Sequence, residues 1–309
     1  MTDIVLKLNN GTTIPALGLG TWQSPKGEVS AAVEYALKET GIRHIDAAFV
    51  YENEQEVGEG IQKAIDAGVV TRDQIFVTTK VFPTYHQRVE ESLNESLKNL
   101  NLDYVDLLLI HWPLGFNPKG NHYLFPTKED GSADYDFSFD IVKMWREFER
   151  IYKTTKKVRA IGVSNCSIPM LESLLPHVEV VPAANQIELH PYLPQPELVD
   201  YCKQRGILIE AYSPLGSVGG PLLKEKGILD LAAKHNAEPA SVLISWHLLE
   251  GRVVLPKSVN PKRIKSNSVL VPLSKDDLEY LDKLSEKYGI HRYNNPQWGA
   301  GILKFPDWQ

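Results

Sequence analysis

Short apolar runs alternate with longer amphipathic segments along the whole chain. Eight of these runs have the length and composition of buried strands, namely Ala16–Thr21, His44–Ala48, Ile75–Val81, Tyr104–His111, Ala160–Asn165, Ala183–His190, Leu208–Pro214 and Val253–Ser258. Apolar residues recur at helical spacing between them, as where Val57, Ile61 and Ile65 form one face. Strands that are each followed by a helix imply parallel pairing, and eight such units fit a closed barrel. The sequence therefore predicts an α/β fold, a (β/α)8 barrel of the TIM type.

Other segments complete this expected barrel. Val89, Leu93 and Leu97 give a second apolar helix face, and further helices are expected around Ser30–Lys38, Asp140–Lys153, Pro196–Gln204, Ala240–Glu250 and Pro261–Asn267. Before the barrel, Asn10-Gly11 separates the apolar stretches Val5–Leu8 and Thr12–Ile14, which predicts a tight N-terminal β-hairpin. No linker-like or low-complexity stretch interrupts the series, so residues 1–309 are predicted to form one domain.

Two segments are longer than a barrel needs. Pro113–Phe139 is a long loop after the fourth strand, and the tail from Ile290 onward is rich in aromatic residues with little periodicity. The loops that follow the strands build the active site in barrels of this kind. Loops of this length are uncommon unless they are functional or disordered. We therefore expect the loop after strand 4 and the C-terminal segment to form walls of a substrate pocket.

The composition limits the partners and the location. The formal net charge of −6 argues against nucleic acid or an anionic membrane as the main partner. No run of apolar residues is long enough for a membrane-spanning helix, and no charged leader precedes an apolar run at the start. Cys166 and Cys202 are the only cysteines, too few for a disulfide framework. The predicted location is the cytoplasm.

Polar and ionisable residues collect at the carboxyl ends of the predicted strands. The set comprises Asp46, Lys80, His111, Asn165, Gln186 to His190, Tyr212, Ser213, Lys257 and Ser258. Each one alone has an ordinary alternative, a polar strand end that meets solvent. A barrel brings all these ends into one ring, and this favours a shared site.

Four residues form a chemically sensible group within this ring. Tyrosine is a weak acid, but an ammonium group such as that of Lys80 would lower the pKa of Tyr51. Asp46 would keep the lysine charged and oriented, and His111 would orient a carbonyl oxygen. This arrangement would protonate an oxygen while hydride reaches the adjoining carbon. Taken singly, Tyr51 could be an exposed loop aromatic and His111 a core histidine.

Two possible phosphate sites differ in strength. Gly18-Leu19-Gly20 resembles the start of a dinucleotide fingerprint, but Gln23 stands where the motif requires Gly or Ala, so a Rossmann site is rejected. The block Pro256–Asn267 runs from the last strand into a helix and holds four basic residues in an acidic protein. It is the better candidate, although a solvated basic helix face is the alternative.

Several motifs resemble those of the aldo-keto reductase family. The segment Gly41–Glu54 is similar to the family's first signature and places Asp46 and Tyr51 in its catalytic positions, while Val77–Lys80 and Leu109–Pro113 supply Lys80 and His111. The stretches Ile161–Asn165, Asn185–Glu188 and Ala211–Gly216 resemble those that bind nicotinamide, and Lys257–Asn267 resembles the signature that binds NADP. The match covers nearly the whole chain in order, and the likeness is greatest to fungal members of the glycerol dehydrogenase and glyceraldehyde reductase kind.

This resemblance implies NADPH or NADP+ as the cofactor, a small-molecule carbonyl substrate, no metal and a monomer. The implied cofactor contacts are Gly20, Thr21, Trp22, Asp46, Ser164, Asn165, Gln186, Tyr212, Ser213, Leu215, Lys257, Ser258, Val259, Asn260, Arg263 and Asn267. Of these, Ser164, Asn165 and Gln186 would hold the carboxamide, and Tyr212 would stack on the nicotinamide ring. The implied substrate-binding residues are Trp22, Tyr51, Phe82, His111, Trp112 and Trp298. Hydroxyaldehydes such as glyceraldehyde, aldoses, keto esters and aromatic aldehydes would all suit them.

Two other kinds of function are weighed against a reductase. A metal-dependent barrel hydrolase would use ligands such as Glu188 and His190 with Asp46 and His111, but no HxH or HExxH spacing occurs. A non-catalytic binding protein on the same fold is the second alternative, since a fold alone never fixes function. The complete group of Asp46, Tyr51, Lys80 and His111 argues against it.

Overall fold

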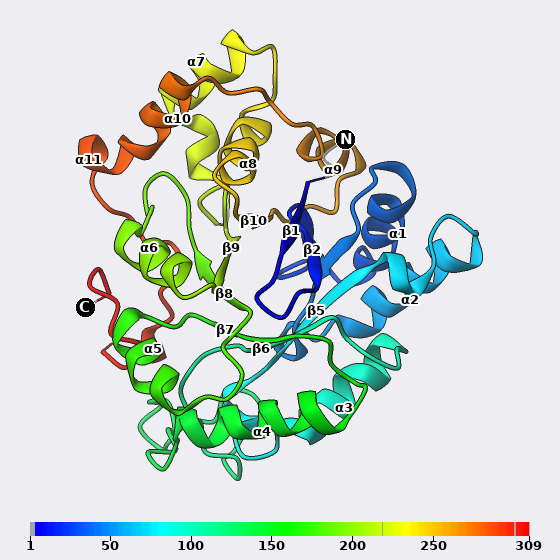
Figure 1. The fold of residues 1–309 in the computed structure, drawn as a ribbon, viewed down its shortest axis with the longest axis vertical. Coiled ribbons are helices and arrows are strands. Elements are labelled where there is room, and N and C mark those ends of the chain that lie inside the picture. Colours follow the sequence, from blue (N-terminus) through cyan, green and yellow to red (C-terminus); the bar gives the residue numbers. More distant parts are fainter. Residues whose placement is uncertain (1–3, 218, 300, 309) are drawn as a thin grey trace.

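Eight parallel strands form a closed barrel in the computed structural model, which describes residues 4–217, 219–299 and 301–308. The strands pair in chain order, β3 Gly18–Gly20, β4 His44–Asp46, β5 Phe76–Val81, β6 Leu107–Ile110, β7 Ile161–Ser164, β8 Ala184–Glu188, β9 Leu208–Tyr212 and β10 Val253–Leu255. Parallel bridges from Leu17 to Val254 and from Gly20 to Lys257 join the first strand to the last. The predicted (β/α)8 barrel is confirmed (Figure 1).

Each strand lies inside its predicted run but is shorter, because the ends leave the ladder. Asn165 and Ser213 have positive φ values of 58° and 50°, which break extended structure directly after β7 and β9. Pro214 has no N–H to donate to a neighbouring strand. The polar ends of the runs thus turn out of the sheet, which places their side chains at the rim of the barrel.

A ring of helices surrounds the strands (Figure 1). The predicted helices are present as α1 Val29–Glu39, α2 Glu54–Asp66, α3 Val89–Leu100, α4 Ile141–Thr154, α6 Pro196–Gln204, α8 Pro239–Leu249 and α9 Pro261–Asn267. Four α-helices were not predicted, α5 Ile168–Leu174, α7 Lys226–Lys234, α10 Lys275–Asp282 and α11 Leu284–Tyr288. Short 3-10 turns include η1 Phe49–Tyr51, η2 Arg72–Gln74, η3 Pro83–Tyr85, η4 Leu175–His177, η5 Pro221–Lys224 and η6 Gln297–Gly299.

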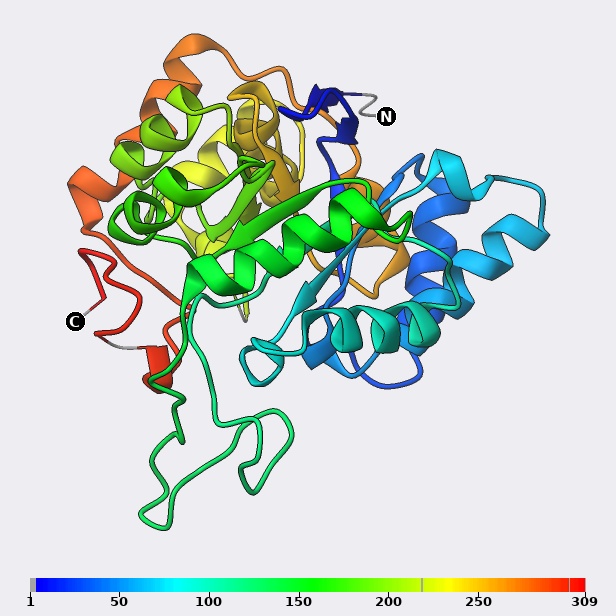
Figure 2. The same ribbon diagram turned by 60° about the horizontal axis from the view of Figure 1, so that its bottom comes forward.

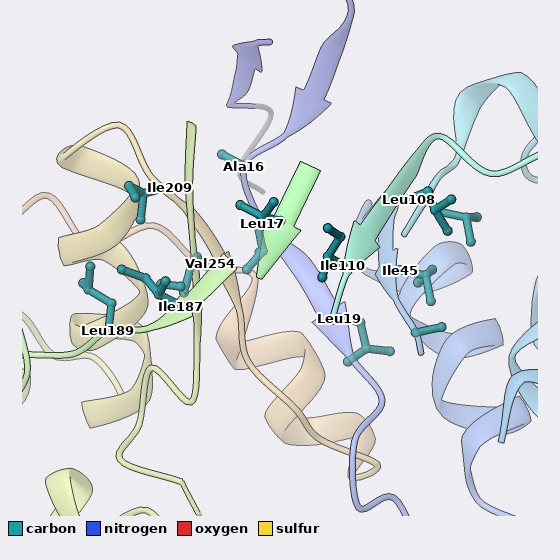
Figure 3. Packing of buried hydrophobic residues seen from close by; sticks show 14 of the residues in the cluster. Ala16, Leu17, Leu19, Ile45, Leu108, Ile110, Ile187, Leu189, Ile209 and Val254 are labelled. Atoms are coloured by element: carbon teal, nitrogen blue, oxygen red, sulfur yellow. The ribbon is translucent and has the colours of Figure 1, made fainter. Parts of the chain in front are cut away.

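Alternate residues of the strands pack into two separate apolar layers. Leu108 and Ile110 on β6 belong to the large cluster between the sheet and the helices, whereas Leu107 and Leu109 belong to a smaller cluster inside the barrel. Figure 3 shows the outer layer, in which side chains such as Ile45 and Leu108 project from the strands. Burial on both faces explains why the strands read as continuous apolar runs instead of an alternating pattern.

The predicted N-terminal hairpin closes the end of the barrel at which the strands begin. Strands β1 Val5–Lys7 and β2 Thr13–Pro15 pair antiparallel, and the hairpin lies over the centre of the ring in Figure 1. Leu8 and Ile14 pack against residues at the starts of the strands, including Phe76. The opposite end, where the strands finish, is therefore the end that is open to a ligand.

The contact between α2 and α3 depends on one glycine. A Cβ atom built on Gly58 would lie 2.2 Å from the carbonyl oxygen of Leu100. We expect Gly58→Ala to lower the free energy of unfolding by about 1–3 kcal/mol, the usual cost of overpacking, despite the better helix propensity of alanine. Denaturant unfolding would measure it. Gln62→Ala, on the exposed side of α2, is the control and should stay within about 0.5 kcal/mol of wild type. Equal stabilities for both variants would contradict the packing argument.

The loop after β6 and the C-terminal segment meet at the open end of the barrel. Figure 2 shows both on the same side of the molecule. The Tyr135 hydroxyl donates to the carbonyl oxygen of Trp298 at 2.5 Å, and Tyr123 donates to Glu52 next to Tyr51. The carboxylate of Glu188 accepts from the backbone N–H groups of Tyr293 and Asn294, both at 2.7 Å. These bonds hold the loop after β6 and the C-terminal segment at the open end of the barrel.

Candidate active site

A cavity of about 1010 Å³ opens where the barrel strands end. One end is aromatic and is lined by Trp22, Val50, Tyr51, Phe82, His111, Trp112, Phe125 and Trp298. The other end is polar and basic, and is lined by Lys257, Ser258, Arg263, Ser266 and Asn267. The cavity is also lined by Ser213, Pro214, Leu215, Ser217, Gly219 and Gly220 after β9, and by Pro239 and Ala240 at the start of α8. The shape suits a long ligand whose anionic end is distant from its reacting end.

A buried lysine connects the strand ends at the aromatic part of the cavity. Lys80, on β5, is 1% exposed. Its Nζ lies 2.8 Å from each carboxylate oxygen of Asp46 at the end of β4, and 2.9 Å from the Ala47 carbonyl oxygen. It also donates to the hydroxyl oxygen of Tyr51 at 3.3 Å. Because that oxygen accepts from Lys80, the hydroxyl hydrogen of Tyr51 is free to be donated into the cavity.

Local structure explains how Tyr51 reaches Lys80 from outside the sheet. The 3-10 turn η1 follows β4 directly, and its backbone bond from Tyr51 N–H to the Ala48 oxygen is 3.0 Å. The turn ends at Glu52 in the left-handed region, with φ of 53°. Helix α2 then starts at Glu54, whose carboxylate accepts from the Thr79 hydroxyl of β5 at 2.6 Å. The tyrosine is thus held between two anchored elements.

Electrostatics keep the lysine charged and the tyrosine neutral. Burial lowers the pKa of the Lys80 ammonium, but Asp46 and Tyr51 raise it, and the net direction is upward. Burial raises the pKa of Tyr51, Lys80 lowers it and Asp46 raises it, and the net direction is again upward. The expected effect of Lys80 is present, but burial outweighs it. Tyr51 is therefore a neutral phenol at neutral pH, the form that can give up a proton.

His111 lies beside Tyr51 at the end of β6. The two ring centres are 5.6 Å apart in an edge-to-face arrangement, and the histidine ring also packs near Phe82 and Trp112. Burial and the Lys80 charge hold the pKa of His111 well below its ordinary value, so the imidazole is neutral. Its Nδ1 has no hydrogen-bond partner among the described residues. A neutral imidazole next to the phenol suits hydrogen bonding to a carbonyl oxygen.

Three side chains of the middle of the cavity bind one another. Asn165 donates to the His111 carbonyl oxygen at 2.9 Å and accepts from the Tyr212 hydroxyl at 2.8 Å. Ser164 donates to the backbone oxygen of Gln186 at 2.8 Å. These bonds fix the position of Tyr212, whose phenol ring lines the cavity. A flat ring held in this way can support another flat ring.

Two cations converge at the other end of the cavity. Lys257 donates to the backbone oxygen of Gln23 at 3.0 Å, and Arg263 donates to the Ser258 hydroxyl at 3.3 Å. Burial lowers the pKa of Lys257, Glu28 raises it and Arg263 lowers it, with a net shift downward. Neither side chain forms an ion pair with a carboxylate in the part of the chain that the structure describes. An anionic ligand group would relieve the repulsion between them.

The structure brings most of the predicted site residues to this cavity. All four proposed catalytic residues and all six proposed substrate residues lie in or at its wall, Lys80 behind Asp46 and Tyr51. Three proposed cofactor residues, Thr21, Val259 and Asn260, do not line it. Thr21 donates to the Asp46 carbonyl oxygen at 2.9 Å, and Asn260 caps α9 by accepting from Arg263 N–H at 3.2 Å. Their proposed cofactor contacts stay predictions.

Other cavity residues were missed by the sequence patterns. Phe125 comes from the long loop and lies 5.2 Å from Phe82 between ring centres, and Asn294 comes from the C-terminal segment. Glu238 lies directly before α8 at the basic end. The two long segments were expected to contribute walls, but no periodicity singled out a residue within them. No feature of the sequence indicated that Glu238 would lie at the cavity.

The ligand set weighed for a metal hydrolase does not come together. Glu188 and His190 bind each other at 2.9 Å, and Glu188 also accepts the two backbone N–H groups of the C-terminal segment. Within the described ranges, no group of three or more His, Cys, Asp and Glu side chains has the geometry to hold a metal ion. The same ranges contain no helix of the length and apolar character needed to cross a membrane.

Comparison with known proteins agrees with this geometry. Residues 16–286 match the sequence profile of the aldo/keto reductase family. The chain therefore belongs to this family and is an oxidoreductase of it, as its motifs predicted.

Individual relatives cover almost the full length. A D-galacturonate reductase of Hypocrea jecorina is 50% identical over 99% of each chain, and a glycerol 2-dehydrogenase (NADP(+)) of Saccharomyces cerevisiae is 49% identical over 95% of each. An aldose reductase structure from Schistosoma japonicum is 37% identical, with a TM-score of 0.89 over 98% of this chain and 99% of that one. The predicted likeness to fungal members is confirmed.

Proposed function

We propose that the protein reduces aldehydes and ketones to alcohols with NADPH, reversibly, and that Tyr51 is the general acid. The observation that carries this proposal is the bonding of Tyr51: its oxygen accepts from buried Lys80, so its own hydrogen faces a cavity lined by His111. In this arrangement Asp46 holds the ammonium, and the ammonium stabilises the phenolate that remains after proton transfer.

The residues of the cavity fit a nicotinamide dinucleotide phosphate. Lys257 and Arg263 would hold its 2′-phosphate, and Tyr212 would support the nicotinamide ring. Gly20, at the end of β3, also lines the cavity. When bound, NADPH supplies the hydride. One relative, the glycerol 2-dehydrogenase (NADP(+)) of Saccharomyces cerevisiae, is named for the same cofactor, which supports this choice.

The chain's own residues would then complete the reduction. His111, neutral, would hydrogen-bond the carbonyl oxygen and orient it toward Tyr51. The aromatic wall of Trp22, Phe82 and Trp112 would exclude water, which strengthens electrostatic interactions at the oxygen. Tyr51 would give its proton to that oxygen as negative charge develops there, and Lys80 would stabilise the phenolate until solvent restores the proton.

A direct assay tests the proposal. The purified protein should oxidise NADPH, followed at its absorbance band, only when an aldehyde such as 4-nitrobenzaldehyde is present, and a chelator should leave the rate unchanged. A protein that binds NADPH but consumes none with a broad panel of aldehydes and ketones would favour the non-catalytic alternative. Sensitivity to the chelator would favour the metal hydrolase.

The charge distribution predicts a preference within the substrate panel. Lys257 and Arg263 are the only Lys and Arg side chains among the described residues of the cavity wall, and both lie at the cofactor end. A uronate carboxylate at the aromatic end would lose water without gaining a cation. We expect kcat/KM for neutral glyceraldehyde to exceed that for D-galacturonate by about tenfold or more, which corresponds to about 1.4 kcal/mol. Equal values would contradict this reading, even though one relative is a D-galacturonate reductase.

Three further predictions rest on the sequence. We propose that residues 1–309 act as one domain, as a monomer and in the cytoplasm. Analytical ultracentrifugation and fractionation of the source cells would test the last two.

A further inference from the structure

Another buried carboxyl group, that of Glu210, lies inside the barrel next to the candidate site. Glu210 is in the middle of β9, is 0% exposed, and pairs in register with Gln186 on β8. The mechanism proposed above makes no use of it. A carboxyl group inside an apolar barrel is costly unless it has a partner or a neutral form, so its presence calls for a physical reason.

Glu210 and Asp46 share one hydrogen-bond donor. The side-chain nitrogen of Gln186 lies 2.9 Å from Asp46 Oδ1 and 3.1 Å from Glu210 Oε2. A primary amide has two N–H hydrogens, so each carboxyl oxygen receives one. Turning the Gln186 amide over would place its oxygen against two carboxyl oxygens. Its nitrogen is therefore fixed toward the two carboxyl groups, and its oxygen is left as an acceptor on a side chain that lines the cavity.

This free acceptor distinguishes Gln186 from its neighbours. Asn165 uses both its nitrogen and its oxygen for protein partners, and Ser164 donates to the Gln186 backbone. Gln186 is thus well placed to accept from the carboxamide N–H₂ group of a nicotinamide, a step that rests on the proposed function.

The net charge of the group formed by Asp46, Lys80 and Glu210 depends on whether Glu210 is ionised. Asp46 and Lys80 form an ion pair that cancels. Oε1 of Glu210 has no hydrogen-bond partner among the described residues, which favours the protonated form. Burial and then Asp46 raise the pKa of Glu210, Gln186 and Lys80 lower it, and the result is about 8. Ionisation would add one uncompensated negative charge next to Gln186, the residue proposed to hold the nicotinamide, whose ring is positive in NADP+.

We propose that Glu210 is a positioning residue for the nicotinamide end of the cofactor: it fixes the orientation of the Gln186 amide, and its ionisation shifts the preference of the site from NADPH toward NADP+.

Several other titratable groups face Glu210 or lie along the same strands. They are His44 and Asp46 on β4, Lys80 on β5, Tyr51, His111, Glu188, His190 and Tyr212. The pKa of His44 falls to about 4 and that of His111 falls well below its ordinary value, while those of Lys80, Tyr51 and Tyr212 are raised. Asp46 is paired with Lys80, and Glu188 with backbone N–H groups.

Linkage gives the sign of the effect. A site that binds NADP+ better when Glu210 is ionised must lower the pKa of Glu210 when NADP+ binds. Rising pH should therefore tighten NADP+ relative to NADPH. A downward shift of one pKa unit on exchange of NADPH for NADP+ corresponds to a tenfold change in the ratio of their Kd values.

The first experiment measures both Kd values by quenching of tryptophan fluorescence from pH 6.5 to 9.5. For wild type, the ratio Kd(NADP+)/Kd(NADPH) should fall about tenfold, whereas for Glu210→Gln, which is neutral at every pH, it should stay constant within about twofold. Glu149→Gln is the matched control, since Glu149 is also buried but accepts from Glu179 and Val180 N–H groups away from the cavity, and it should behave as wild type. An unchanged pH dependence in Glu210→Gln, or none in wild type, would overturn the inference.

Two further measurements test the positioning role and the charge role of Glu210 separately. At pH 6.5, Glu210→Gln retains an acceptor for Gln186 and should bind NADPH within about twofold of wild type, whereas Glu210→Leu should bind it about fivefold or more weakly. Equal binding by both would overturn the positioning role.

Calorimetry of the wild-type protein at pH 8, in two buffers of different ionisation enthalpy, needs no variant. It should show more protons released on binding NADP+ than on binding NADPH. Equal release would overturn the charge role. Failure of the wild-type protein to bind either cofactor would instead overturn the proposed function on which the inference rests.

Discussion

Tyr51→Phe is expected to reduce kcat for carbonyl reduction by about 10²–10⁴-fold, the usual contribution of a general acid. The hydroxyl oxygen accepts from Lys80, so its hydrogen is free to be donated to a group in the cavity. Phenylalanine keeps the ring that packs edge-to-face with His111 at 5.6 Å and lies 5.0 Å from Lys80 Nζ. The cavity shape should therefore be preserved, and the Kd for NADPH should change by less than about threefold. Stopped-flow hydride transfer and fluorescence titration would measure the two quantities.

The matched control is Tyr85→Phe. Tyr85 is buried near the site, and its hydroxyl donates to Glu95 at 3.1 Å instead of facing the cavity. It should retain kcat within about twofold. If Tyr51→Phe keeps more than a tenth of the wild-type kcat, Tyr51 is not the acid. A loss of NADPH binding in the same variant would point to a structural role of the hydroxyl.

The barrel could be predicted because its signals are local. Each strand is a short apolar run, and long helices such as α2 have their apolar residues at a helical spacing that the sequence displays, as at Val57 and Ile61. The missed helices are short. Helix α5 spans seven residues, and α10 starts with Ser274 and Asp277 in a capping arrangement that uses Asp where Glu or Gln is usual.

The proposed catalytic group could also be predicted from the sequence, because a barrel brings the polar residues at the ends of all its strands into one ring. The rest of the site depends on long-range contacts. Phe125 and Asn294 reach the cavity only because Tyr135 and Glu188 tie their irregular segments to distant parts of the chain. Glu210 did carry a signal, a carboxyl group between Ile209 and Ala211 inside a strand. Its significance appears only when Gln186 and Asp46 are brought beside it.

Arg263→Ala is expected to raise the KM for NADPH by about 10–100-fold while the weaker reaction with NADH stays within about twofold of wild type. The guanidinium and the Lys257 ammonium converge at one end of the cavity, and neither forms an ion pair with a carboxylate among the described residues. NADH lacks the 2′-phosphate, so it gains nothing from either charge. A charge-assisted hydrogen bond contributes about 1.5–3 kcal/mol, which is the predicted loss for NADPH.

Lys262→Ala separates a specific contact from a general effect of charge. Lys262 is the exposed neighbour of Arg263 on α9, does not line the cavity, and changes the net charge equally. If the phosphate is bound by contact, Lys262→Ala should leave both KM values within about twofold, and raised salt should weaken NADPH binding in wild type more than in Arg263→Ala. Equal losses in the two variants would mean that the whole basic helix attracts the cofactor by its field. An Arg263→Ala enzyme impaired equally with NADPH and NADH would place Arg263 outside the phosphate site, and the assignment of Tyr51 and Lys80 would be unaffected.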